Sequence, residues 1–284
     1  MSSPPSAEQG RPVGIVVPNT EPGADRAVRE LPRVFEQLGY RSLWVTDHVV
    51  GTRSMEPVHG AYWLDAVTVL AHMAATTSTA RLGVGVLVVP YRNPVLTAKM
   101  LASVDVLSDG RLDVGVGTGW IRTEYRALGV GQLFAPRGRV TDEALDLMRT
   151  CWRGGEVEHE GEFFTVRHVT FEPVPVQRPH PPLWIGGQSG PALRRAARFA
   201  DVWHPHDLGP EDVERLGAQL DEAAGRRVPR SVRLHATGED VPALADLVDH
   251  YLAAGCVHVV VEFRSQPVDV VAACAEKAAA VLFG

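Results

Sequence analysis

The sequence has few lysines, few cysteines and no long apolar run. Only Lys99 and Lys277 are lysines, and the formal net charge of the 284 residues is −6. Binding to a nucleic-acid backbone needs a concentrated basic surface, so this charge argues against nucleic acid as a partner. No apolar run approaches the roughly 18 residues of a membrane span. We therefore expect a small-molecule partner and no membrane partner.

The three cysteines, Cys151, Cys256 and Cys274, are widely spaced and form no CxxC pattern. They predict neither a disulfide framework nor a zinc site, and are expected to be small buried apolar side chains. Among eleven histidines, His204 and His206 form an HxH pair. Because no carboxylate cluster or third histidine stands at a useful spacing, no metal site is predicted.

The N-terminal MSSPPSAEQG is polar and lacks the apolar stretch of a signal peptide. Residues 1–10 are therefore expected to be a disordered tail, and the protein to be cytoplasmic. The rest of the chain has no linker or low-complexity tract, and its 45% apolar and 22% charged residues suit a globular protein. Residues 11–284 are predicted to form one domain.

Short β-branched runs alternate with longer amphipathic stretches along this domain, which is typical of βα units and a parallel sheet. Eight such runs are predicted as strands, at residues 13–17, 42–48, 82–89, 112–117, 183–187, 201–205, 232–236 and 257–263. Helical patterns lie between them, at residues 25–38, 96–107, 143–152, 192–200, 213–224, 241–254 and 268–282. Eight strands favour a closed (β/α)8 TIM barrel over an open doubly wound sheet.

One connection is longer than the others. Residues 152–183 contain GEFFTV, VTFEPVPV and the proline-rich QRPHPP. These stretches indicate an inserted hairpin and extended segment between the fourth helix and the fifth strand, near the rim of the barrel.

Barrel enzymes carry their active sites at the carboxyl ends of the strands, so the residues that close each strand are the candidates. The second strand ends in Thr46, Asp47 and His48. Side chains alternate along a strand, so Trp44, Thr46 and His48 share one face. His48 could transfer a proton near neutral pH, although a histidine at a strand end can also be purely structural.

Two glycine-rich turns are candidate ligand sites. The GTGW sequence after the fourth strand lacks the spacing of a dinucleotide fingerprint, but its glycines permit close approach of a flat ring. Trp44 and Trp120 could wall such a ring, or be ordinary core aromatics. The GGQSG turn after the fifth strand precedes a helix that carries Arg195, and free amides with a positive helix end favour an anion there. His204, near the barrel mouth, could contact substrate.

Four stretches together resemble the luciferase-like family of F420-dependent oxidoreductases. They are SLWVTDHVV (42–50), VVPYRNPVLTAKMLASVDVLSDGRLDVGVGTGWIRTEYRALGV (88–130), APRGRVTDEALDLMRTCW (135–152) and PVQRPHPPLWIGGQSGPALRRAARFADVWHP (175–205). The resemblance implies a (β/α)8 barrel that holds coenzyme F420, a deazaflavin, at the strand ends.

The resemblance also implies roles for individual residues. His48 would be the catalytic acid or base, and Asp47 would contact the deazaflavin head. Val88 and Val89 would back the ring at a non-prolyl cis peptide bulge. The remaining cofactor contacts it implies are Gly117, Thr118 and Gly119 around the ring, and Gly186, Gly187, Gln188, Ser189 and Arg195 around the phosphate.

By this resemblance the chain would pass a hydride between F420 and a small organic substrate, as a reductase. Members that oxidise glucose 6-phosphate carry glutamate after GTG, where this sequence has Trp120, so a sugar phosphate is not expected. An FMN-dependent monooxygenase, supplied with reduced flavin by a partner enzyme, is the alternative. A catalytically silent cofactor-binding barrel is a third reading, and a homodimer fits any of them.

Overall fold

The computed structural model describes residues 10–52, 61–263 and 266–284. Apart from Gly10, the predicted tail lies outside the described residues.

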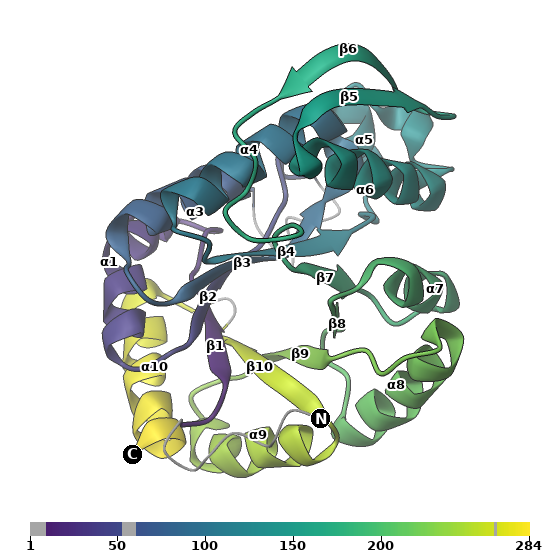
Figure 1. Ribbon diagram of the computed structural model, residues 1–284. Coiled ribbons are helices and arrows are strands. Elements are labelled where there is room, and N and C mark those ends of the chain that lie inside the picture. Colours follow the sequence, from purple (N-terminus) through teal and green to yellow (C-terminus); the bar gives the residue numbers. More distant parts are fainter. Residues whose placement is uncertain (1–9, 53–60, 264–265) are drawn as a thin grey trace.

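Eight parallel strands form a closed barrel (Figure 1), in the order β1, β10, β9, β8, β7, β4, β3, β2. The strands are β1 (Val13–Val16), β2 (Ser42–Val45), β3 (Arg81–Val88), β4 (Leu112–Gly117), β7 (Leu183–Gly186), β8 (Val202–His204), β9 (Arg230–His235) and β10 (Cys256–Glu262). Each corresponds to one predicted run, so the predicted TIM barrel is confirmed.

Helices cover the outside of the barrel. They are α1 (Ala24–Gln37), α3 (Ala66–Thr76), α4 (Pro94–Leu107), α5 (Arg122–Ala127), α6 (Arg137–Arg153), α7 (Gly190–Phe199), α8 (Pro210–Ala224), α9 (Leu244–Ala253) and α10 (Val268–Phe283). Short 3-10 helices are η1 (Val89–Tyr91), η2 (Gly131–Leu133) and η3 (Val241–Ala243). All seven predicted helical patterns fall on these elements.

Most of the strands are apolar runs because both of their faces are covered, whereas β9 (RSVRLH) carries several polar side chains. Every residue of β1 and of β2 is buried, and Val16 of β1 pairs with Trp44 of β2. One side of each strand meets the surrounding helices and the other meets the barrel interior, as expected for a parallel sheet. The consequence is a rigid frame whose strand ends are fixed in position.

Two helices, α3 and α5, have no counterpart in the predicted pattern. The α3 sequence, AVTVLAHMAAT, is apolar nearly all round, and α3 contacts both α1 and α4. A helix covered on several sides loses the polar face that makes helical periodicity visible in a sequence. The six residues of α5 are too few to show a period.

The predicted insertion is present between α6 and β7 as an antiparallel hairpin of β5 (Gly155–Glu160) and β6 (Thr165–Phe171). Figure 1 shows it projecting from the outer side of α6. The carboxylate of Glu143 in α6 accepts backbone hydrogen bonds from Glu162, Phe163 and Phe164 at the hairpin tip. α6 therefore holds the hairpin on the outer side of the barrel, and its predicted place near the rim stays a prediction.

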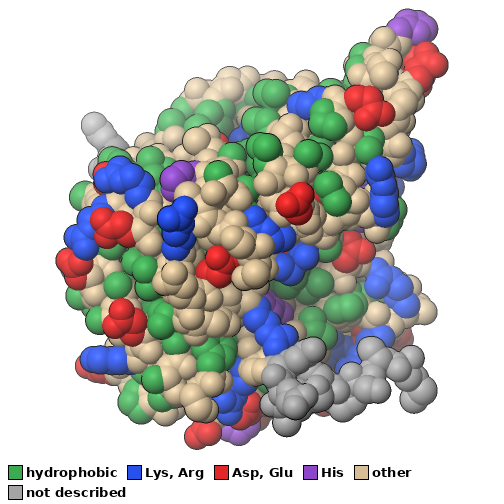
Figure 2. Space-filling model, turned by 60° about the vertical axis from the view of Figure 1, so that its left-hand side comes forward, with side chains coloured by type: hydrophobic (Ala, Val, Ile, Leu, Met, Phe, Trp, Pro, Cys, Tyr) green, Lys and Arg blue, Asp and Glu red, His purple; other side chains and the backbone are tan. Residues whose placement is uncertain are grey.

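Cys151, Cys256 and Cys274 are buried free thiols, as predicted. Within the described ranges, no helix is both long and apolar enough to cross a membrane. Acidic and basic side chains are interspersed over the face drawn in Figure 2, without a large patch of one sign.

Candidate functional site

A cavity of about 800 Å³ opens at the carboxyl ends of the barrel strands. Its walls come from residues that end or follow the eight barrel strands, together with the N-terminal parts of α6 and α7. This is where barrel enzymes place their active sites.

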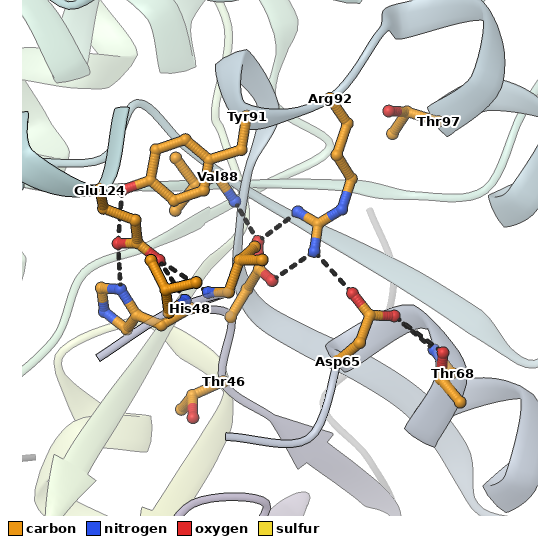
Figure 3. Close-up of polar contacts among 12 residues, drawn as sticks. Thr46, His48, Asp65, Thr68, Val88, Tyr91, Arg92, Thr97 and Glu124 are labelled. Atoms are coloured by element: carbon orange, nitrogen blue, oxygen red, sulfur yellow. Dashed lines mark hydrogen bonds and ion pairs between the residues drawn. The ribbon is translucent and has the colours of Figure 1, made fainter. Parts of the chain in front are cut away.

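A buried ion pair fixes the part of the wall that follows β2. The Asp47 carboxylate accepts two hydrogen bonds of 2.8 Å from the Arg92 guanidinium and one of 2.9 Å from the backbone N–H of Val88. Arg92 also binds Asp65 at 2.8 Å, as Figure 3 shows. The Asp47 side chain is fully buried, so its carboxylate joins the ends of β2 and β3. Asp47 also lines the cavity, so its contact with the cofactor head stays a prediction beside this positioning role.

His48 lines the cavity beside a buried carboxylate. Its Nδ1 lies 2.8 Å from Oε2 of Glu124, which also accepts a 2.7 Å hydrogen bond from the Tyr91 hydroxyl (Figure 3). Burial alone would raise the pKa of Glu124, but hydrogen bonds from His48, the backbone of Val49 and Tyr91 bring that pKa below its usual value. Glu124 is therefore held as a carboxylate that can orient the imidazole through this hydrogen bond. Nothing in the sequence singles out Glu124, since 76 residues separate it from His48.

The wall formed by β3 and β4 consists mainly of valines and glycines. Val86 and Val88 line the cavity, and so do Gly117, Thr118 and Gly119. A Cβ at Gly117 would lie 2.4 Å from a methyl carbon of Val86, so only glycine lets the two strands meet this closely.

The expected non-prolyl cis peptide is present, but between Gly85 and Val86, where the pairing of β3 with β4 shifts register. The predicted position at Val88 and Val89 is corrected accordingly. Val89 belongs to η1, is buried in the outer core and does not line the cavity.

Two helix N-termini meet at one end of the cavity. Gly186, Gly187 and Ser189 precede or open α7, and the Ser189 hydroxyl caps that helix by accepting from Ala192 N–H at 3.4 Å. The first turn of α6 contributes Arg137 and Gly138. Gln188, predicted beside them, does not line the cavity.

Two arginines stand at this end. Arg195 lines the cavity as predicted, although its guanidinium is already bound to Asp142 and to the Gly138 carbonyl. Arg137, which the sequence does not single out, packs on the Phe134 ring and forms no ion pair within the described ranges. Helix N-termini and uncompensated guanidinium charge together make this end suited to an anion.

Of the three predicted substrate contacts, the structure places one on the cavity and two below it. Trp120 lines the cavity and is 60% exposed. Trp44 and His204 are buried in the barrel interior, where their rings stack with centroids 5.0 Å apart, and neither lines the cavity. The predictions that Trp44 and His204 contact substrate are corrected accordingly. Alternation along a strand identifies the residues that face the barrel interior but not how far below the cavity they lie.

The wall formed by β8, β9 and β10 is polar, and the sequence does not reveal it as a unit. His206 and Asp207 follow β8, while Arg233 and His235 of β9 and Glu262 of β10 complete it. The Asp207 carboxylate lies 2.6 Å from Nδ1 of His235, and Nε2 of His235 lies 3.1 Å from Glu262. Hydrogen bonds from the backbone and ring of His235 overcome burial and lower the pKa of Asp207.

The sequence profile of the luciferase-like monooxygenase family matches residues 12–268. The chain belongs to this family. An uncharacterized protein of Mycobacterium tuberculosis is 31% identical over 252 residues, which are 82% of this chain and 84% of that relative. The oxygenase component of a flavin-dependent trigonelline monooxygenase from Acinetobacter baylyi is 28% identical over 196 residues, 68% of this chain and 52% of its own length.

The fold of this luciferase-like chain also matches a solved F420-dependent secondary alcohol dehydrogenase in complex with an F420-acetone adduct. The TM-score is 0.78 over 97% of this chain and all of that chain, at 16% identity. Such a likeness supports the barrel fold alone, and the chemistry has to be inferred from the residues of the site. The family's relatives and structural neighbours thus include both flavin-dependent and F420-dependent enzymes.

A planar, anionic cofactor fits the observed walls. The β3 and β4 side offers apolar contact with closely spaced glycines, and the α6 and α7 end offers amide N–H groups and arginine charge. Both properties belong to this chain's own residues, so the fit does not depend on the relatives.

Proposed function

We propose that this luciferase-like oxidoreductase binds coenzyme F420 and transfers a hydride between the deazaflavin and a small organic substrate, acting as a reductase. One observation carries the proposal: the smooth valine and glycine wall adjoins an end with two helix N-termini and two arginines. A flat ring and a negatively charged tail need these two environments side by side.

The chain's own residues have separate tasks in this proposal. Val86, Val88, Gly117 and Gly119 would hold the ring, and Arg137 with the first turns of α6 and α7 would hold the phosphate. His48, backed by Glu124, would hold or move a proton beside the ring. When bound, a deazaflavin supplies a two-electron hydride carrier, and the protein supplies position and electrostatics.

FMN is the second candidate cofactor. The flavin-dependent monooxygenase among the relatives favours it, and the single phosphate of FMN would suit the same anion-binding end. In that case the chain would be a monooxygenase that receives reduced flavin from a partner reductase. A silent cofactor-binding barrel would bind either cofactor without turnover.

Side-by-side titrations of the purified chain with F420 and with FMN test the proposal. We expect the lower dissociation constant for F420. Tighter binding of FMN would replace the proposal with the monooxygenase, and binding of neither would overturn both. Turnover by the loaded protein would exclude the silent barrel. Light scattering of the same sample would test the expected homodimer.

A further inference from the structure

The two sides of the cavity differ in chemistry. The β3 and β4 wall carries valines and glycines, whereas the β8, β9 and β10 wall carries His206, Asp207, Arg233, His235 and Glu262. Arg233 extends across the barrel and donates a hydrogen bond to the Gly85 carbonyl on the opposite strand. If the first wall holds the cofactor ring, the second faces whatever binds above that ring.

His206 is the most accessible imidazole of the polar wall. Its side chain is 58% exposed, and Nδ1 lies 3.5 Å from Oδ2 of Asp207. Burial and the positive charge of Arg233 lower the pKa of His206, Asp207 opposes this change, and His235 adds to it. The ring is therefore uncharged at neutral pH and able to accept a proton.

Asp207 is fixed in place by β9. Its backbone has a φ of 49°, in the left-handed region that favours glycine but that aspartate adopts more readily than most residues. The Asp207 N–H donates to the Arg233 carbonyl at 2.8 Å, and its carboxylate accepts from the backbone N–H and the Nδ1 of His235. A backbone held in such a conformation is common where a side chain must be presented to a ligand.

We propose that His206 exchanges the substrate proton, and that Asp207 and His235 are its positioning residues. The inference rests on the proposed function. In oxidation of an alcohol, the O–H proton passes to the His206 ring and a C=O bond forms. The carbinol hydrogen leaves with its electron pair to the oxidised cofactor. Reduction returns the same proton to the substrate oxygen.

His48 is less suited to this task. Its side chain is only 14% exposed, Nδ1 is occupied by Glu124, and the ring packs on Trp63 with centroids 4.7 Å apart. His48 also follows β2, beside the apolar wall. The two histidines would then divide the work, with His48 toward the cofactor and His206 toward the substrate.

Carbethoxylation of histidines by diethyl pyrocarbonate, mapped by mass spectrometry, tests the placement without any substrate. We expect His206 to react in the free protein and in protein saturated with whichever of F420 or FMN binds. The same cofactor should slow the reaction of His48 at least about tenfold, a protection equivalent to about 1.4 kcal/mol. Equal shielding of both histidines, or an unreactive His206, would overturn the inference.

The pH dependence of this reaction tests the positioning role. Because Asp207 raises the pKa of His206, Asp207→Asn should move the midpoint of His206 modification to lower pH, and asparagine tolerates the same backbone conformation. An unchanged midpoint would remove Asp207 from the proposal. His168, 86% exposed on the hairpin, should react equally in both proteins.

Kinetics separate this inference from the proposed function. With secondary alcohols and their ketones as probes, His206→Gln should lower turnover by about 10²–10⁴ while the cofactor dissociation constant stays within threefold. His168→Gln is the matched control. If the protein binds cofactor and turns over, and His206→Gln turns over at the same rate, only the role of His206 is overturned. If the protein binds no cofactor, the proposed function itself is overturned.

Discussion

The Arg92 guanidinium and the Asp47 carboxylate face each other through two parallel hydrogen bonds of 2.8 Å, with the Asp47 side chain fully buried. The pair joins the end of β2 to the segment that follows β3. Both residues that flank this junction, His48 and Val88, line the cavity.

Arg92→Leu should lower the free energy of unfolding by about 3–5 kcal/mol, because it leaves a buried carboxylate without its partner. Chemical denaturation measures the loss. Arg29→Leu is the matched control, since it removes a solvent-exposed pair with Asp25 and should change the free energy of unfolding far less. Similar losses in the two variants would contradict the structural role of the buried pair.

His48→Ala should lower turnover by about 10²–10⁴ if this ring transfers a proton in the rate-limiting step, with a much smaller change in cofactor affinity. Steady-state kinetics and cofactor titration on the same preparation measure both. Rates within threefold of the unmodified protein would leave His48 a structural residue. A loss confined to cofactor affinity would assign His48 to binding.

Arg137→Ala should weaken FMN or F420 by about 1.5–3 kcal/mol, the value of one hydrogen bond to a charged group. The phosphate-free chromophore should bind the variant and the parent equally. Arg122→Ala provides the control, because Arg122 packs on the same Phe134 ring but does not line the cavity. Equal losses for the complete cofactor and the bare chromophore would show that Arg137 acts through the fold.

Stability should fall as the pH drops below about 6.5, the usual pKa of histidine. Burial lowers the pKa of His258 to about 3, so the unfolded chain binds a proton there that the folded chain does not. The contribution of such a buried histidine to stability therefore rises with pH up to about 6.5 and is constant above it, with a slope of about 1.4 kcal/mol per pH unit for each such group.

His258→Gln should reduce the slope of stability against pH between pH 5 and 6.5 by about the share of one proton. Some slope should remain, because the pKa of buried His204 is also lowered. Glutamine can keep a hydrogen bond to Ser42, which lies 2.7 Å from the histidine ring. Urea unfolding at several pH values measures the slope. An identical slope in the variant would mean that His258 is charged in the folded protein.

The barrel could be predicted because most of its strands are apolar on both faces and each is bounded by turn residues. The hairpin could be predicted from its proline-rich exit. Helix α3 could not, because α1 and α4 cover the faces that would otherwise be polar. Local patterns therefore identified the elements whose burial leaves a visible period or boundary in the sequence.

The site was predictable only where a motif stays within a few residues. GTGW and GGQSG each place glycines on the cavity, but the partner of His48 is Glu124, contributed by a separate helix. His204 and His206 share an inward face, and only the structure shows which lies at the mouth and which lies under Gly85. Depth along a barrel strand depends on the register of all eight strands, which no single segment encodes.

Arg233 connects the two sides of the cavity through its hydrogen bond to the Gly85 carbonyl. In the proposed function, this hydrogen bond would tie the segment that faces the cofactor ring to the segment that faces the substrate. Changing specificity by altering β9 alone would also disturb the cofactor wall, so variant libraries for new substrates should vary residues near Gly85 and Arg233 together. A new activity selected in this barrel would then require paired substitutions on opposite strands.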